Sequence, residues 1–443
     1  MSPTTQGAIV LLATLAVLLS GAPVAFGLGA LSIVFLIMFQ GFPALQVVAE
    51  TFYAGLNDFT LVSIPMFVMM GAAIGSSPAG RDLYEALDRW LYRLPGGLVI
   101  SNLGACAIFA ALTGSSPACC AAIGKMGIPE MRKRGYPDEI ATGSICAGGT
   151  LGILIPPSIT FILYGIATET SIGRLFLAGV VPGLMLTGLF MLWTLFAIWR
   201  RGFRSHPPEF RYSWKEKFQS IPKVAPFLAI IVGVMYVLYG GVATPSEAAG
   251  VGAALCVLSA LVIYRMWRPG EWWKILRDTT RESIMILTII AAAVLFGYML
   301  TSLYLTQTLA QAIADMHVNR WVLMGLINVF LLVCGFFIPP AAIILMTSPI
   351  LLPIITAAGF DPVWFGVIVT INMEIGLIHP PVGLNIYIVS SIAPDVPLMK
   401  VIWGTVPYVL CMFLAIVILC VFPEIATWLP DTLMGPVRGA AKG

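Results

Sequence analysis

The feature that most constrains this chain is the series of long apolar segments that fills it. Segments such as 172–198 and 401–422 are about as long as a helix that crosses a hydrocarbon core of roughly 30 Å. Only 10% of the residues are charged, against roughly 25% in soluble domains. The sequence therefore predicts an all-α polytopic membrane protein and excludes a soluble enzyme with a single anchor.

The apolar segments fall into two sets of similar order. We expect ten spans, at 7–20, 22–39, 62–78, 137–168 and 172–198, and at 224–240, 244–264, 284–303, 362–394 and 401–422. Two further apolar regions, 97–131 and 321–357, are interrupted by "TGSSPA" and "FFIPPAA". Each limb is too short to cross the membrane, so both regions are predicted to be re-entrant hairpins.

The two halves of the chain resemble each other. With a shift of 224 residues, Gly135 aligns with Gly359 and Gly152 with Gly376, and "IPPS" aligns with "HPPV". Five spans per half is an odd number, so the second half must enter the membrane upside down. The prediction is two inverted repeats, 1–199 and 224–443, each with five spans and a hairpin and joined by a cytoplasmic linker at 200–223. Inverted repeats with broken helices are typical of secondary transporters.

The basic residues indicate an orientation. One topology, with both termini outside, places all but four of the 24 Lys and Arg residues in the cytoplasm. The four exceptions are Arg174, Arg320, Arg438 and Lys442. This asymmetry follows the positive-inside rule.

The first hairpin carries small and hydroxylated residues at its expected tip, Gly114, Ser115 and Ser116. Such residues are common in helix packing, but a tip that faces a broken helix favours a ligand role. The broken helices are expected at 137–168 and 362–394, each around a Pro-Pro pair. In the first, Gly149, Gly152 and the prolines are predicted to bracket an unwound stretch, with Pro157 at the first helical position.

Unwound backbone has a chemical use at membrane depth. Its free carbonyls are hard oxygen ligands for Na⁺, and the N-terminus of the next half-helix attracts a carboxylate. The alternative is that each kink serves packing only. The presence of kinks at equivalent positions of both halves argues against this alternative.

Three other polar positions leave choices open. Glu374, which aligns with Thr150, could bind a cation or hydrogen-bond the broken backbone. For Glu247, at the start of a span, a structural cap is favoured over ion binding. His379 has no partner at metal-ligand spacing, and Cys119-Cys120 is interpreted as packing.

Several function classes are excluded by what the sequence lacks. It has no GxxxxGK[ST] phosphate-binding loop, so transport energy would come from an ion gradient. No nucleophile–base–acid set points to an enzyme, and we expect no nucleic-acid partner. The basic and aromatic linker is expected to meet lipid headgroups.

Three long motifs carry a family resemblance: "TGSSPACCAAIGKMGIPEMRKRGY", "GGTLGILIPPSITFILYGIATETSIGRLFLAGVVPGLML" and "MEIGLIHPPVGLNIYIVSSIA". They resemble the large membrane subunit of tripartite ATP-independent periplasmic (TRAP) transporters, the DctM-like family. The resemblance implies a Na⁺-coupled importer of an organic acid, such as a C4-dicarboxylate or sialic acid, in the bacterial inner membrane. It implies an elevator-type fold with scaffold and transport domains. It also implies two partners, a separate small four-helix membrane subunit and a soluble periplasmic binding protein.

The resemblance also implies residue roles. One Na⁺ site would combine Gly114, Ser115 and Ser116 with the break at Gly149, Thr150 and Gly152. The other would combine Pro339, Pro340 and Thr347 at the second hairpin with Glu374 and Gly376. Substrate would meet Ser158, Asn385 and the proline pairs, represented by Pro156 and Pro380. The "SPACC" and His379 positions depart from the family's usual residues, which leaves the substrate open.

Two alternatives remain at this stage. A stand-alone divalent-anion/Na⁺ symporter would share the architecture and need no binding protein. A membrane scaffold or enzyme would tolerate bulky residues in the hairpins and breaks.

Overall fold

The computed structural model describes residues 3–91, 96–202, 212–308, 311 and 318–436, and every regular element among them is a helix. The first-half helices are α1 (Pro3–Leu19), α2 (Val24–Gln40), η1 (Phe42–Leu45), α3 (Gln46–Leu56), η2 (Phe59–Val62), α4 (Ser63–Gly75), α5 (Ala79–Leu91), α6 (Gly97–Thr113), α7 (Ser116–Lys133), α8 (Asp138–Leu154), α9 (Ile159–Thr168) and α10 (Ile172–Arg200). The second-half helices are α11 (Trp214–Tyr239), α12 (Pro245–Val262), α13 (Pro269–Ser302), α15 (Arg320–Gly335), α16 (Pro340–Ala357), α17 (Pro362–Ile378), α18 (Leu384–Ile392), α19 (Leu398–Val421) and α20 (Glu424–Met434).

The predicted hairpins and broken helices are present in both halves. In the first half, α6 and α7 form hairpin 1, and α8 and α9 flank break 1 with a bend of 41°. In the second half, α15 and α16 form hairpin 2, and α17 and α18 flank break 2. The order hairpin, broken helix, final long helix is therefore the same in each half.

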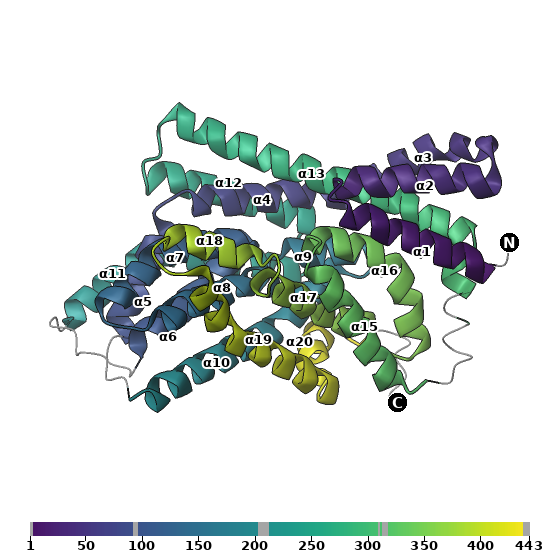
Figure 1. Ribbon diagram of the computed structural model, residues 1–443. Coiled ribbons are helices and arrows are strands. Elements are labelled where there is room, and N and C mark those ends of the chain that lie inside the picture. Colours follow the sequence, from purple (N-terminus) through teal and green to yellow (C-terminus); the bar gives the residue numbers. More distant parts are fainter. Residues whose placement is uncertain (1–2, 92–95, 203–211, 309–310, 312–317, 437–443) are drawn as a thin grey trace.

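The two halves pack across each other at these elements. Helix α7 of hairpin 1 packs on α18, α16 of hairpin 2 packs on α9, and α8 packs on α17. Figure 1 shows this group beneath a layer that contains α12, α4, α13, α2 and α1. Both broken helices thus contribute to one body. The inverted relation of the halves stays a prediction.

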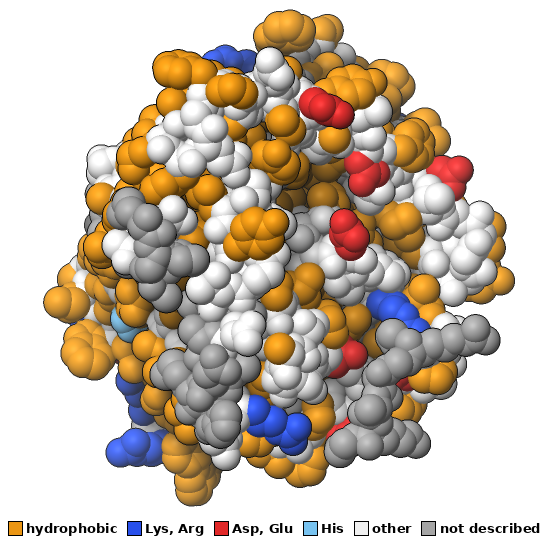
Figure 2. Space-filling model, turned by 90° about the vertical axis from the view of Figure 1, so that its right-hand side faces the viewer, with side chains coloured by type: hydrophobic (Ala, Val, Ile, Leu, Met, Phe, Trp, Pro, Cys, Tyr) orange, Lys and Arg blue, Asp and Glu red, His pale blue; other side chains and the backbone are white. Residues whose placement is uncertain are grey.

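Helix length and composition support a membrane protein. Among the described residues, six helices are long and apolar enough to span a membrane, and two bent pairs raise the number to eight. The helices α1, α2 and α17 are shorter apolar helices, so the expected ten spans stay a prediction. Large apolar side chains are exposed on the outside of the protein. Among them, Leu12 is 66% exposed and Phe26 is 71% exposed. Figure 2 shows hydrophobic side chains over much of one face, with acidic and basic side chains among them.

Several boundaries differ from the sequence prediction. The linker 200–223 is shorter than expected, because α11 already begins at Trp214. Ser213 and Glu216 form a capping box there, in which each side chain satisfies the other's backbone N–H. The span expected at 284–303 begins earlier than predicted, because a single 34-residue helix, α13, also contains most of the basic segment 265–281. Its first-half counterpart is bent by 57° between α3 and α4.

The first residues of α1 lie at the opposite end of the molecule from the end of α10 and the start of α11 (Figure 1). The connection between α10 and α11 belongs to the basic segment predicted to be cytoplasmic. The arrangement agrees with an N-terminus on the other side of the membrane. Part of the segment, including His206, lies outside the described residues, as does His317.

Candidate substrate and ion site

The tip of hairpin 1 touches break 1 through backbone. Gly114 ends α6 with a left-handed φ of 57°, which favours glycine. A Cβ added to Gly114 would lie 2.9 Å from the carbonyl oxygen of Pro157, and one on Gly152 would lie 2.7 Å from that of Ser115. The structure therefore brings together the tip and the break that the sequence predicted to form one site.

The unwound stretch is shorter than predicted. Helix α8 continues regularly through Gly149, Thr150 and Gly152 to Leu154, so the prediction that these glycines bracket unwound backbone was wrong. They serve close packing instead, because a Cβ on Gly149 would overlap Sγ of Cys120 on α7. The hydroxyl of Thr150 donates to the carbonyl of Ala147 within its own helix, at 2.6 Å.

The helix after the first proline pair begins later than predicted. Pro157 is not the first helical residue, because α9 begins at Ile159 and Ser158 is its N-cap. Ser158 is fully buried, donates to the carbonyl of Ile153 and accepts from the N–H of Phe161. This cap satisfies one free N–H group at the start of α9. The other free N–H groups at this helix start lie near hairpin 1. Pro156 lies in the break, and its peptide bond to Pro157 is cis.

Asn385 joins the second half to the tip of hairpin 1. Its side-chain nitrogen donates to Oγ of Ser116 at 2.8 Å and to the carbonyl of Cys146 at 3.2 Å. The side chain is fully buried, and its oxygen has no hydrogen-bond partner among the described residues. A predicted ion ligand and a predicted substrate ligand are thus in direct contact, although 269 residues separate them.

The tip of hairpin 2 touches the end of α17 in a related way. A Cβ on Gly376 would overlap the carbonyl oxygen of Gly335, at the end of α15. Phe336 stacks on His379 with ring centroids 4.7 Å apart, which places break 2 and Pro380 beside this tip. Pro339 is the N-cap residue of α16. The hydroxyl of Thr347 bonds to Ile343 of its own helix at 2.8 Å, and no described hydrogen bond joins it to α17.

Glu374 lies within α17, is fully buried and has no hydrogen bond to either carboxylate oxygen among the described residues. A buried charge without a partner is strongly disfavoured, so this carboxyl must be neutral or hold a cation. The same stretch of α17 also carries Asn372. Its side-chain nitrogen bonds to the side-chain oxygen of Asn328 on α15 and to the carbonyl of Ile368. The interior near hairpin 2 is therefore polar within an apolar body.

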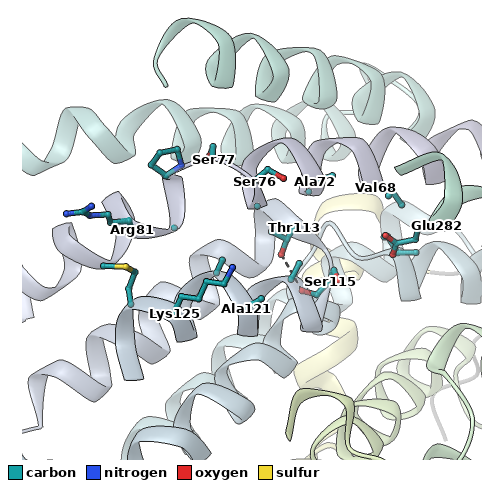
Figure 3. Close-up of a pocket in the computed structure, with 18 residues that line it drawn as sticks. Val68, Ala72, Ser76, Ser77, Arg81, Thr113, Ser115, Ala121, Lys125 and Glu282 are labelled. Carbon is teal, nitrogen blue, oxygen red and sulfur yellow. Dashed lines mark hydrogen bonds between the residues drawn. The ribbon is translucent and has the colours of Figure 1, made fainter. Parts of the chain in front are cut away.

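A cavity of about 450 Å³ lies against hairpin 1, and Ser115 lines it. The other walls come from four segments: α4 and α5 with the turn between them, helix α7, the start of α9, and α13. Figure 3 shows Ser115 and Thr113 in the middle, with Arg81 and Lys125 toward one end and Glu282 at the other. Ser115 therefore faces open space, whereas the neighbouring Ser116 is bonded to Asn385.

The basic end of this cavity is suited to an anion. Lys125 is exposed and forms no ion pair within the described part of the chain. Arg81 bonds to Glu85 at 2.8 Å, and that hydrogen bond raises the pKa of the guanidinium. A carboxylate entering the cavity would meet the Lys125 side chain, the Arg81–Glu85 ion pair and the Ser115 hydroxyl.

Sequence reasoning missed Arg81 and Lys125 as site residues and counted them only as topological markers. No local signal identifies them, because the cavity forms between segments that are distant in the chain. It also missed Asn328 and Asn372, for which a signal exists: an amide inside an apolar helix is rare and needs a partner.

Two other predictions are settled by contacts. Glu247 forms a capping box with Thr244, which confirms the structural cap. Cys119 and Cys120 bond separately, to the carbonyls of Cys106 and Ile145, which confirms their interpretation as packing residues. Among the described residues, no group of three His, Cys, Asp or Glu could hold a metal ion.

Comparison with known proteins gives a family match over nearly the whole chain. The model for the "Tripartite ATP-independent periplasmic transporter, DctM component" matches residues 11–425. The chain is 38% identical to the C4-dicarboxylate TRAP transporter large permease protein DctM of Pseudomonas aeruginosa, covering 85% of this chain and 87% of that protein. It is 34% identical to the protein of the same name in Vibrio cholerae, covering 97% and 98%.

A relative with a different substrate and a solved structure extend the comparison. The sialic acid TRAP transporter large permease protein SiaM of Vibrio cholerae is 31% identical, covering 95% of this chain and 97% of that protein. The crystal structure of the Alcanivorax borkumensis YdaH transporter superposes with a TM-score of 0.66 at 16% identity, covering 97% of this chain and all of that one. At that identity the likeness concerns the fold alone.

Proposed function

This chain belongs to the family of the DctM component of tripartite ATP-independent periplasmic transporters, and on that premise we propose that it imports an organic acid by Na⁺ symport. It is a multi-pass membrane protein, and its relatives are transport permeases rather than enzymes. The named substrates of those relatives are C4-dicarboxylates and sialic acid, which are both carboxylates. The substrate class proposed here is therefore a small carboxylic acid.

The observation that carries the proposal is the cavity beside hairpin 1. It joins a cationic end, formed by Arg81 and Lys125, to the hydroxyl of Ser115 at the tip. A substrate carboxylate gains Coulomb attraction at that end. The N-terminal amides of α7 and α9, which begin at the tip and after break 1, favour the same negative charge.

Na⁺ coupling is supported by the chemistry of the two tips. Backbone carbonyls of Ser115 and Pro157 lie at the contact between hairpin 1 and break 1, and carbonyl oxygens are ligands that Na⁺ accepts. At hairpin 2 the carbonyl of Gly335 and the unpartnered carboxyl of Glu374 lie on neighbouring helices. We assign the two Na⁺ sites to these two regions.

The transport cycle we propose is an elevator movement. The moving body would consist of hairpins 1 and 2 with both broken helices, which pack across the two halves. The fixed body would include α4 and α13, which form the opposite walls of the cavity. A small four-helix membrane subunit and a periplasmic binding protein complete the system in the bacterial inner membrane.

The decisive experiment is uptake in proteoliposomes that contain the chain and the small subunit. We expect accumulation of a labelled carboxylate only with an inward Na⁺ gradient and with the binding protein present. Uptake that needs Na⁺ but no binding protein would favour a stand-alone divalent-anion/Na⁺ symporter. Uptake indifferent to Na⁺ would contradict the coupling.

Ser115→Ala tests the site within the same assay. Because the Ser115 hydroxyl faces the cavity and has no role in the Asn385 contact, its loss should weaken Na⁺-dependent uptake with little effect on melting temperature. Ser391→Ala is a matched control, since Ser391 is exposed and bonds only to its own helix. An unchanged Na⁺ response in Ser115→Ala would assign this serine to packing.

A further inference from the structure

Helix α13 is longer than a membrane requires. Its 34 residues extend about 51 Å, whereas the hydrocarbon core is roughly 30 Å thick. Charged residues are confined to its N-terminal part, up to Glu282, and the remainder is uncharged to Ser302. The N-terminal part of α13 therefore lies at the level of the lipid headgroups.

One face of that part forms a shallow groove. It is lined by Trp273, Leu276, Arg277, Thr280, Arg281 and Ile284. Their spacing of three and four residues places them on a single side of the helix. Trp273 is 72% exposed and Ile284 is 58% exposed, so the face is open.

The opposite face of the same segment is attached to the protein. Ile275 is buried against Ala260 and Met266. The hydroxyl of Thr279 contacts Sδ of Met69 on α4 at 3.7 Å, and the indole of Trp272 donates to the carbonyl of Met266 at 2.6 Å. The groove therefore points away from the molecule.

The charge of the groove is positive. Arg277 and Arg281 form no ion pair with any described residue. At about 100° per residue, Asp278 and Glu282 lie toward the other side of the helix. Glu282 lines the internal cavity, which agrees with that placement.

We propose that this groove binds the headgroup of an anionic phospholipid from the cytoplasmic leaflet. The phosphate would accept hydrogen bonds from Arg277 and Arg281, and from the hydroxyl of Thr280 between them. The acyl chains would lie along Ile284 and the apolar remainder of α13.

The order of residues along the helix favours a lipid over an acidic protein segment. Tryptophan comes first, then the two arginines, then exposed Ile284 and Met285, which is 54% exposed. This sequence follows the polarity gradient of a membrane from the interface to the hydrocarbon. An acidic peptide would match the arginines but would leave the apolar end without a counterpart.

The test compares two double variants of the full-length chain, each co-purified with the small subunit in mild detergent. Arg277→Gln/Arg281→Gln removes the charges of the groove, and Arg268→Gln/Lys274→Gln removes two charges from the same end of α13. Retained phospholipid is measured by native mass spectrometry after exposure to phosphatidylglycerol, phosphatidylethanolamine or inorganic phosphate.

Wild type and the control variant should retain phosphatidylglycerol in preference to phosphatidylethanolamine. The groove variant should lose that retention by about fivefold per arginine removed. Equal retention in wild type and groove variant would overturn the proposal. Loss of lipid retention in the presence of inorganic phosphate alone would also overturn it, because that result would indicate a site for a free anion. Loss of the small subunit without loss of lipid would assign the groove to a subunit contact instead.

Discussion

Gly152 lies where the backbone of hairpin 1 crosses α8, and no larger residue fits there. A Cβ at this position would lie 2.7 Å from the carbonyl oxygen of Ser115 and 2.9 Å from the nitrogen of Ser116. Both are backbone atoms, so the clash cannot be relieved by a rotamer change. The tip and the break would have to separate.

We therefore expect Gly152→Ala to lower stability by about 1–3 kcal/mol and to reduce Na⁺-dependent uptake severely. Gly188→Ala is the control, because a Cβ there has no atom within 4 Å and alanine favours a helix. Melting temperature and uptake per folded molecule are the measurements. Normal uptake in Gly152→Ala would mean that contact between tip and break is not required.

At the residue scale, sequence reasoning predicted that the tip of hairpin 1 meets break 1, but not the direction in which each side chain points. It grouped Ser115 with Ser116 as ligands, whereas the structure directs one to the cavity and the other to Asn385. Adjacent residues at a helix start point in different directions, and which neighbour each one meets depends on a helix from the other half.

At the element scale, Glu247 shows that a carboxylate in an apolar region can be purely structural. Its side chain accepts from the N–H and the hydroxyl of Thr244, at 2.8 and 2.9 Å, and Thr244 accepts in return. These bonds satisfy free groups at the start of α12. Glu374, by contrast, has no such partner among the described residues.

Glu247→Ala should lower stability by about 1 kcal/mol and leave Na⁺-dependent uptake per folded molecule unchanged. Glu247→Gln should recover part of the stability, because a glutamine oxygen can still accept from Thr244. Thermal unfolding, followed with and without Na⁺, measures the stability of both variants. A change in Na⁺ dependence for either variant would contradict the assignment as a cap.

The hairpins and breaks were predictable because proline and glycine act locally on the backbone. The length of α13 was not predictable, because charged residues at 265–281 match either a connecting segment or the end of a long helix. Packing of this segment on α4, through Thr279 and Met69, favours the continuous helix. Helices α3 and α20 were also missed.

At the scale of the whole molecule, the two halves are joined by an ion pair as well as by packing. Arg132, at the end of α7, pairs with Asp395 between α18 and α19, and also with Asp138 at 3.0 Å. The hydrogen bond to Arg132 holds the pKa of Asp395 below its ordinary value of 3.8. A carboxyl with a lowered pKa stabilises the folded state above that ordinary value and loses this effect as the pH falls through the folded pKa.

Asp395→Asn should therefore lower the melting temperature slightly at pH 7, and the difference from wild type should shrink as the pH falls below 3.8 and through the lowered pKa. The side chain of Asp395 is 61% exposed, so added salt should also reduce the effect. Lys133→Gln, which removes a pair within one helix, is the control. A difference that persists at the lowest pH would exclude the ion pair as its source.

The cavity between α4 and α7 allows a test of the elevator movement. Ala72 and Ala121 lie on these two helices and both line the cavity (Figure 3). We expect a bifunctional thiol reagent to block uptake by an Ala72→Cys/Ala121→Cys variant, because it would fasten the moving body to the fixed one. Each single variant treated in the same way is the control. Undiminished uptake by the cross-linked protein would contradict relative movement here.

The sequence by itself determined the membrane helices, the two hairpins and the two breaks. Hydropathy, helix length and the effect of Pro and Gly on the backbone are properties of short segments, so a single sequence is enough to predict them. The internal similarity of the halves was visible for the same reason.

Only the tertiary structure decided which groups meet. The bond between Asn385 and Ser116, the cavity with Arg81, Lys125 and Ser115, and the pair of Arg132 with Asp395 join different segments. No local pattern encodes such contacts, because each depends on how several helices pack around both residues. Hydropathy predicts where a helix lies in the chain, and packing decides which of its side chains face a cavity.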